Sequence, residues 1–84
     1  MSSASVEEYL EAIYSFNEKG IWAKNQALSK KLKVSPPSVT QMVKRLSDEG
    51  LVLYKPYKGV LLTGMGLALA EKVVRKHRLL ECFL

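Results

Sequence analysis

Two pairs of possible metal ligands lie near opposite ends of this 84-residue chain. Glu8 and Glu11 are spaced i, i+3, and His77 and Glu81 are spaced i, i+4. Each pair would therefore share one face of a helix. Carboxylates combined with an imidazole suit a borderline or hard divalent ion such as Mn²⁺ or Fe²⁺. Spacing alone leaves simpler interpretations open: the early pair could be a helix cap and a solvated charge, and the late pair a surface contact.

Residues 34–46, VSPPSVTQMVKRL, indicate a different chemistry. Apolar residues at helical spacing predict a buried face: Val39, Met42, Val43 and Leu46. The opposite face is small and polar at first and basic one turn later: Pro37, Ser38, Thr40, Gln41, Lys44 and Arg45. Ser, Thr and Gln can hydrogen-bond to base edges, Pro can contact a thymine methyl group, and Lys and Arg can reach phosphates. We therefore predict that this helix enters the major groove of double-stranded DNA.

Two consecutive prolines mark the start of this helix. Ser35 is predicted as the N-cap and Pro36 as the first helical residue, where the missing N–H has no helical partner to lose. Pro37 follows at the second position and is tolerated for the same reason. Gly50 is predicted to end the helix.

The residues before it predict two further helices. One runs from about residue 4 to 18, and Ser5 with Glu8 can form its capping box. Its apolar residues recur at i, i+3, i+4 and i+7: Val6, Tyr9, Leu10 and Ile13. Asn25 is predicted to cap a short second helix, and residues 33–35 form a tight turn into the third.

The residues after Gly50 predict a β-hairpin. Residues 51–54 and 60–63 are expected to form its strands around the turn KPYKG, and Trp22 with its neighbours could add a short third strand. The hairpin tip carries residues suited to holding the DNA backbone or minor groove: Lys55, Tyr57 and Lys58.

A last helix is predicted from Thr63 to the chain end, with one apolar face: Leu69, Val73, Leu80 and Leu84. The order helix, helix, turn, helix, hairpin, helix predicts a mainly α fold with a small β-hairpin, the winged helix-turn-helix. We expect the DNA-binding domain at residues 1–62, and a helix at 63–84 that leads toward a further domain.

The charge distribution supports a polyanionic partner for most of the chain. The net charge is +5, yet residues 1–20 hold four glutamates against one lysine, so the remaining residues carry +8. Cys82 is the only cysteine, which favours a reducing cytoplasm, and no apolar run is long enough for a membrane span. An enzyme is not expected, because no nucleophile, base and orienting group recur together.

Two other interpretations stay open at this point. The polar face of residues 35–45 could be solvated surface in a winged helix that binds proteins. The chain could also be a winged-helix regulator that responds to a signal other than a metal.

Three segments resemble the N-terminal domain of the diphtheria toxin repressor and manganese transport regulator family: SVEEYLEAIY, VSPPSVTQMVKRLSDEGLVLYKPYKGVLLTGMGLALA and RKHRLLECFL. The resemblance covers nearly the whole chain in order. It implies a cytoplasmic, dimeric, metal-activated repressor of metal-uptake genes. The metal positions that it implies are Glu8, Glu11, His77 and Glu81, and the DNA-contacting positions are Ser35, Pro37, Ser38 and Gln41.

The chain departs from this family pattern at two points. Iron-type members have Met at position 8 and manganese-type members typically have Asp, whereas this chain has Glu, so a carboxylate ligand favours Mn²⁺ over Fe²⁺. Family members also continue into a helical dimerisation domain with further metal ligands. We therefore expect the chain to be a fragment with an incomplete metal site, and the intact protein to be a homodimer.

Overall fold

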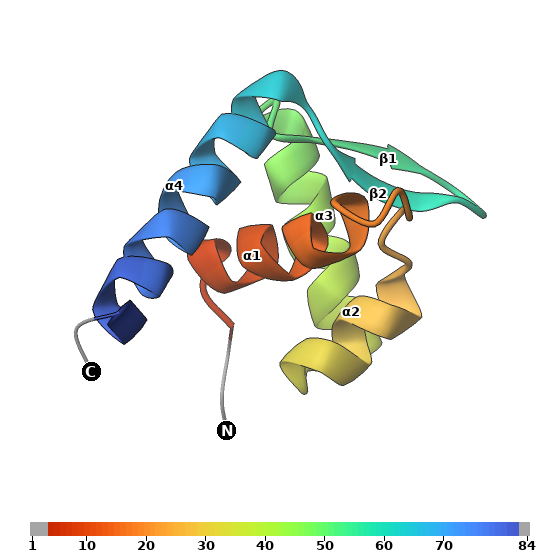
Figure 1. Ribbon diagram of the computed structural model, residues 1–84. Helices are drawn as coiled ribbons and strands as arrows, with labels where there is room; N and C mark the ends of the chain where they lie inside the picture. Colours follow the sequence, from red (N-terminus) through yellow and green to blue (C-terminus); the bar gives the residue numbers. More distant parts are fainter. Residues whose placement is uncertain (1–3, 83–84) are drawn as a thin grey trace.

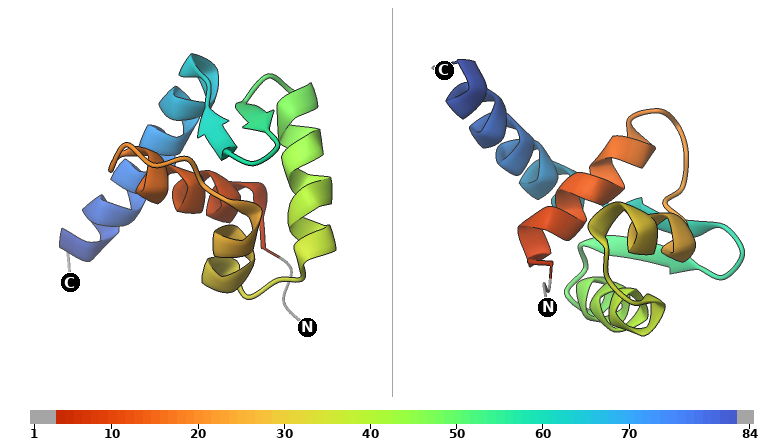
Figure 2. Two further views of the ribbon diagram at one scale, coloured as in Figure 1. Left: turned by 90° about the vertical axis from the view of Figure 1, so that its right-hand side faces the viewer. Right: turned by 90° about the horizontal axis from the view of Figure 1, so that it is seen from below.

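The computed structural model describes the backbone of residues 4–82 and the side chains of residues 4–76. Four helices and a two-stranded antiparallel sheet follow one another (Figure 1): α1 Val6–Asn17, α2 Asn25–Leu32, α3 Pro36–Asp48, β1 Val52–Lys55, β2 Gly59–Leu62 and α4 Gly64–Cys82. This order confirms the predicted winged helix-turn-helix. The hairpin tip and the far end of α4 lie at opposite ends of the molecule (Figure 2).

Two of the first three helices begin as predicted, with a serine cap. The Ser5 hydroxyl accepts the N–H of Glu8 at 3.2 Å, and the Glu8 carboxylate accepts the N–H of Ser5 at 3.0 Å, which completes the capping box. Ser35 caps α3 by accepting the N–H of Ser38 at 3.3 Å. The prediction for α2 was wrong: Lys24 occupies its N-cap without a side-chain bond, and Asn25 is already helical.

The turn between α2 and α3 depends on one left-handed residue and one serine. Lys33 adopts φ 57° and ψ 46° at the C-cap of α2, which reverses the chain direction. The Ser29 hydroxyl donates to the Val34 carbonyl at 2.6 Å, and the Ser29 carbonyl accepts the Val34 N–H at 3.2 Å. These bonds fix the angle at which α3 leaves the turn.

Both strands of the hairpin lie one residue nearer to its tip than predicted, at 52–55 and 59–62 instead of 51–54 and 60–63. Its register runs from Val52 opposite Leu62 to Lys55 opposite Gly59. A turn of only three residues closes it, since Tyr57 adopts a left-handed φ of 75° and Gly59 a φ of 113°. Ala23, next to Trp22, forms an isolated antiparallel bridge with Val60, which supplies the short third strand.

One hydrophobic core is formed by side chains from the helices and from the sheet. Fully buried side chains come from α1, α2, α3 and β2: Leu10, Ile13, Leu28, Val39, Leu46 and Val60. Tyr9 is also buried, and desolvation raises its pKa above the usual value of 10.0, so the hydroxyl stays neutral. Met42 is only half-buried at the edge of this core. No helix in the described part of the chain is long and apolar enough to cross a membrane.

Helix α4 packs through small residues rather than through the predicted leucine. Gly66, Ala70 and Val73 are buried, whereas Leu69 is 40% exposed. The absence of a side chain at Gly66 lets the α4 backbone approach the carbonyl of Leu51, and a Cβ there would overlap that oxygen. The Leu69 prediction was therefore wrong, because close approach requires the small residues to face inward. Leu80 and Leu84 lie outside the described side chains.

We expect Gly66→Ala to lower the free energy of unfolding by about 1–3 kcal/mol, because the added methyl group forces the α4 backbone away from Leu51. Gly64→Ala is the matched control, since nothing lies within 4 Å of its added Cβ. Urea denaturation compares the two variants. Equal stabilities would contradict the close contact at Gly66.

Candidate nucleic-acid interface

The polar face predicted for α3 is exposed along its whole length. Every member of the predicted set is solvent-accessible: Ser35, Pro37, Ser38, Thr40, Gln41, Lys44 and Arg45. The hydroxyls of Ser35 and Ser38 lie 2.8 Å apart, so both take part in the cap at the front of the helix. Among the described residues Gln41 makes no side-chain hydrogen bond, so its amide is available to a base edge.

Thr40 connects α3 to α2 in addition to lying on this exposed face. Its hydroxyl donates to the carbonyl of Pro36 at 3.2 Å and lies 3.5 Å from the Asn25 Nδ2. The Asn25 Oδ1 is buried and has no partner among the described residues. The start of α2 is therefore held directly beside the second turn of α3.

The basic residues of α3 can bind phosphates with little loss of existing ion-pair energy. Arg45 pairs with Glu49 at 3.4 Å, but both side chains are largely exposed, at 64% and 48%. Such a pair contributes about 0–1 kcal/mol, so a DNA phosphate can compete for the guanidinium. Lys44 is exposed one position earlier.

The hairpin presents its tip residues to solvent. Tyr57 is 100% exposed in its left-handed conformation, so its ring is accessible at the hairpin tip. The Lys58 ammonium lies 5.7 Å from the centre of the Trp22 ring, which orients it by a cation–π contact. Lys55 ends β1 and is also exposed.

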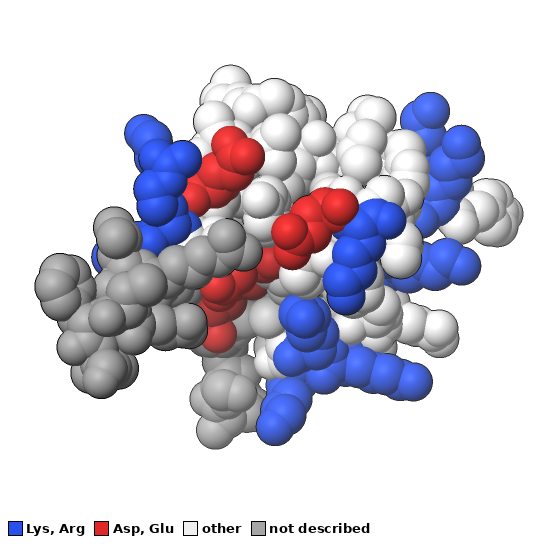
Figure 3. All heavy atoms as spheres, viewed as in Figure 1, with Lys and Arg blue, Asp and Glu red and all other residues white. Residues whose placement is uncertain are grey.

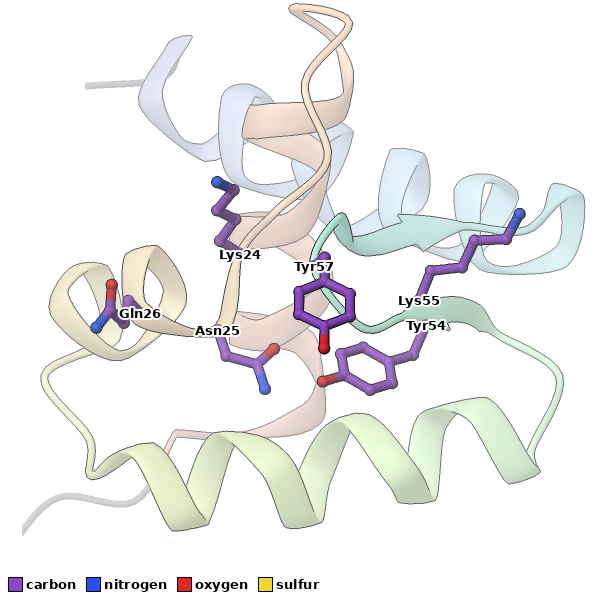
Figure 4. A pocket seen from close by; sticks show the side chains of 7 residues that line it. Lys24, Asn25, Gln26, Tyr54, Lys55 and Tyr57 are labelled. Atoms are coloured by element: carbon purple, nitrogen blue, oxygen red, sulfur yellow. The ribbon is translucent and has the colours of Figure 1, made fainter.

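A pocket of about 210 Å³ separates the start of α2 from the hairpin (Figure 4). It is lined by Lys24, Asn25, Gln26, Tyr54, Lys55, Tyr57 and Gly59. No binding role was predicted for the α2 residues or for Tyr54. The sequence feature that could have indicated one is the polar run of residues 24–26, which begins the first helix of the helix-turn-helix and precedes α3.

Positive charge surrounds this pocket on two sides. Figure 3 shows Lys and Arg gathered over α2 and the hairpin, with acidic residues over α1 and a separate basic group on α4. The exposed lysines of α2 and the hairpin are Lys30, Lys31, Lys55 and Lys58, with Lys24 and Lys33 at the ends of α2. This separation of charge agrees with the acidic start and basic body of the sequence.

The structure describes the side chains of two of the four predicted metal ligands. Glu8 is exposed on α1 and engaged in the capping box, and Glu11 is half-buried one turn later. Helix α1 packs against α4, the helix that carries positions 77 and 81, so the two ligand pairs belong to contacting helices. The side chains of His77 and Glu81 lie outside the described residues. Within the described residues, no group of three or more His, Cys, Asp or Glu side chains is placed to hold a metal.

The sequence matches a known family over most of the described residues. Residues 1–60 match the family described as iron dependent repressor, N-terminal DNA binding domain. The chain belongs to the iron-dependent repressor family. The match includes α1, α2, α3 and β1, and so contains the whole helix-turn-helix and its exposed face. The family resemblance predicted from the sequence is thus confirmed.

Relatives of this iron-dependent repressor domain are longer proteins. The HTH-type transcriptional regulators MntR of Bacillus subtilis strain 168 and of Listeria monocytogenes strain HCC23 are each 37% identical over 84 residues, which is 100% of this chain and 59% of each relative. The chain therefore spans about three-fifths of their length.

Two solved structures share the fold. The manganese regulator SloR is 42% identical, with a TM-score of 0.82 over 99% of this chain and 39% of its own. ScaR with bound Zn²⁺ is 38% identical, with a TM-score of 0.80 over 96% and 37%.

We expect Glu8→Ala to lower the metal-free unfolding free energy by about 0.5–2 kcal/mol, because the Ser5 N–H loses its acceptor. Glu8→Gln should leave it nearly unchanged, since the amide oxygen can accept the same bond. Thermal denaturation in chelator measures both variants. Equal losses would show that the charge of Glu8, rather than the hydrogen bond, stabilises α1.

Proposed function

We propose that this chain is the DNA-binding domain of a dimeric, metal-dependent transcriptional repressor of metal-uptake genes, acting in the cytoplasm. The observation that carries the proposal is the exposed polar face of α3, which lies beside lysines of α2 and the hairpin in a domain of the repressor family. A binding role is favoured over a catalytic one, because the family that matches residues 1–60 is described as a DNA binding domain.

The recognition helix α3 would read bases while its neighbours hold the backbone. The exposed side chains of its first turn, Pro37 and Ser38, are small, so this end of the helix can approach the floor of the major groove closely. Gln41 would pair with a base edge from the centre of the exposed face. Lys24 and Lys55, on the two sides of the pocket, would meet phosphates flanking the groove.

Metal control would act through α1 and α4. The proposed ligands are carboxylates from Glu8 and Glu11 on α1 and the side chains of His77 and Glu81 on α4, a set of nitrogen and oxygen donors suited to Mn²⁺. When bound, such an ion supplies a positively charged cross-link between ligands on different helices. Fixing α4 against α1 would set the spacing of two recognition helices in a dimer at about one DNA turn, roughly 34 Å.

The names of the relatives support manganese as the preferred metal. SloR is a manganese regulator, and ScaR has been solved with bound Zn²⁺, so manganese and zinc are the two metals named for these related proteins. The carboxylate at position 8 is a harder ligand than the Met of iron-type family members, which favours Mn²⁺ over Fe²⁺ here.

Metal titration of the intact protein tests the proposal. Anisotropy of a labelled duplex, selected from a random pool, is measured with Mn²⁺, Fe²⁺, Zn²⁺ or chelator at fixed salt. We expect Mn²⁺ to promote tight binding, and His77→Ala to abolish that response while keeping the wild-type melting temperature in chelator. Equal binding in chelator would indicate a regulator that answers another signal. Binding that fails to weaken with salt would indicate a protein-binding winged helix.

We expect Gln41→Ala to cost about 1–3 kcal/mol on the selected duplex and far less on random DNA, because it removes a base contact. Lys44→Ala is the matched control one turn along the same face. It should weaken binding to both DNAs similarly and lower the salt slope by about 0.9. Equal losses on the two DNAs for Gln41→Ala would contradict base reading.

A further inference from the structure

The side chain of Asn17, the last residue of α1, contacts the β1–β2 hairpin, the wing of this winged-helix fold (residues 52–62). The residues that it contacts there are 43–45 positions away in the sequence. Its Oδ1 accepts the N–H of Leu62 at 2.9 Å. Its Nδ2 donates to the carbonyls of Ile21 at 2.9 Å and Val60 at 3.4 Å. Neither of the two roles already proposed for the domain, base reading or metal binding, uses this residue.

The carboxamide of Asn17 makes hydrogen bonds at the outer edge of β2 that a backbone peptide group would make if the third strand were longer. The inner edge of β2 pairs with β1, and on its outer edge Val60 exchanges two backbone hydrogen bonds with Ala23, at 2.8 and 2.9 Å. No backbone strand continues from Ala23 along this edge toward Leu62 within the described residues. The Asn17 carboxamide accepts the N–H of Leu62 and donates to the Val60 carbonyl, which also accepts the N–H of Ala23. Its side-chain amide therefore continues the hydrogen bonding of the third strand.

The hydrogen bond between Asn17 and Leu62 lies at the base of the wing, at the opposite end of β2 from the tip residues that would touch DNA. Each strand has four residues, so the tip lies about 13 Å from the base. A rotation of about 10° at the base would move the tip by roughly 2.3 Å over that length. Such a shift is enough to break a hydrogen bond or ion pair with a phosphate.

A second path joins Asn17 to the wing tip. The Ile21 carbonyl that it holds immediately precedes Trp22, whose ring orients the Lys58 ammonium from 5.7 Å. Loss of the Asn17 amide would therefore remove one restraint from the base of β2 and one from the segment that supports Lys58, and would leave the Ala23–Val60 bridge as the remaining link between them.

The main core does not include this residue. Asn17 is half-buried, and the buried cluster of the domain is formed by other side chains. Its hydrogen bonds fix an angle between α1 and the wing rather than fill the interior.

We propose that Asn17 is a positioning residue for DNA binding, which holds the wing at the angle where its cations and the recognition helix engage one DNA duplex together. This inference rests on the proposed DNA-binding function.

The salt dependence of DNA binding by the intact protein, in Mn²⁺, tests the inference. Each phosphate contact contributes about 0.9 to the slope of log K against log salt. We expect Asn17→Ala to lower the slope by about 1–2 and to weaken binding about tenfold at 0.1 M salt. In a Lys55→Ala/Lys58→Ala background, where the wing cations are already gone, Asn17→Ala should leave the slope unchanged.

Ser15→Ala is the matched control, because it removes one side-chain hydrogen bond from the same helix, from Oγ to the Ala12 carbonyl at 2.6 Å, without any link to the wing. It should keep the wild-type slope. If Asn17→Ala fails to fold, Asn17→Asp replaces it, since the carboxylate still accepts the Leu62 N–H but loses both donor bonds. Its slope should also fall.

Amide hydrogen exchange gives an independent measurement. The inference requires faster exchange at Leu62 in Asn17→Ala, which loses the acceptor of that N–H, with Leu46 in the core still protected. An unchanged slope in a folded variant, or an equal decrease in the background without wing lysines, would overturn it. A wild-type protein whose DNA binding does not respond to salt would instead overturn the proposed function itself.

Discussion

The geometry of the candidate DNA-binding surface depends on the backbone bridge between Ala23 and Val60. This pair of hydrogen bonds fixes the hairpin to the segment that opens α2, and the pocket lined by both elements lies directly beside it. The bridge requires Gly59, because a Cβ there would lie 2.5 Å from the Ala23 carbonyl oxygen. A single close approach thus sets the distance between the basic residues of α2 and those of the wing.

The parts of the fold that follow from local periodicity could be predicted from the sequence. The exposed and buried faces of α3, its serine cap and its prolines lie where the pattern indicates. The strand ends differ by one residue, because the left-handed conformation of Tyr57 tightens the turn, and a non-glycine residue gives little local sign of this. Leu69 was misplaced because tertiary packing of α4 selects small residues over the most hydrophobic ones.

The candidate site was only partly visible in the sequence for a related reason. Residues of α3 share one helix and one face, so their spacing alone brings them together. Lys24 and Tyr54 are joined only by folding, through the bridge at Ala23, and no spacing rule relates them. Asn25 illustrates the same limit, since a residue type favoured in caps is used instead to join α2 to Thr40.

The inward-facing Gly66 fixes the first turn of a long helix, so the position of its far end determines the angle of α4. With its first turn seated against Leu51, at the connection between α3 and β1, this helix of 19 residues extends for about 28 Å. A displacement of 1 Å at its far end corresponds to a tilt of only about 2° at that seat, over the same helix length. An attachment at the far end would therefore fix the angle between α4 and the connection that follows α3 accurately, because the length of α4 reduces a displacement at that end to a small rotation at Leu51.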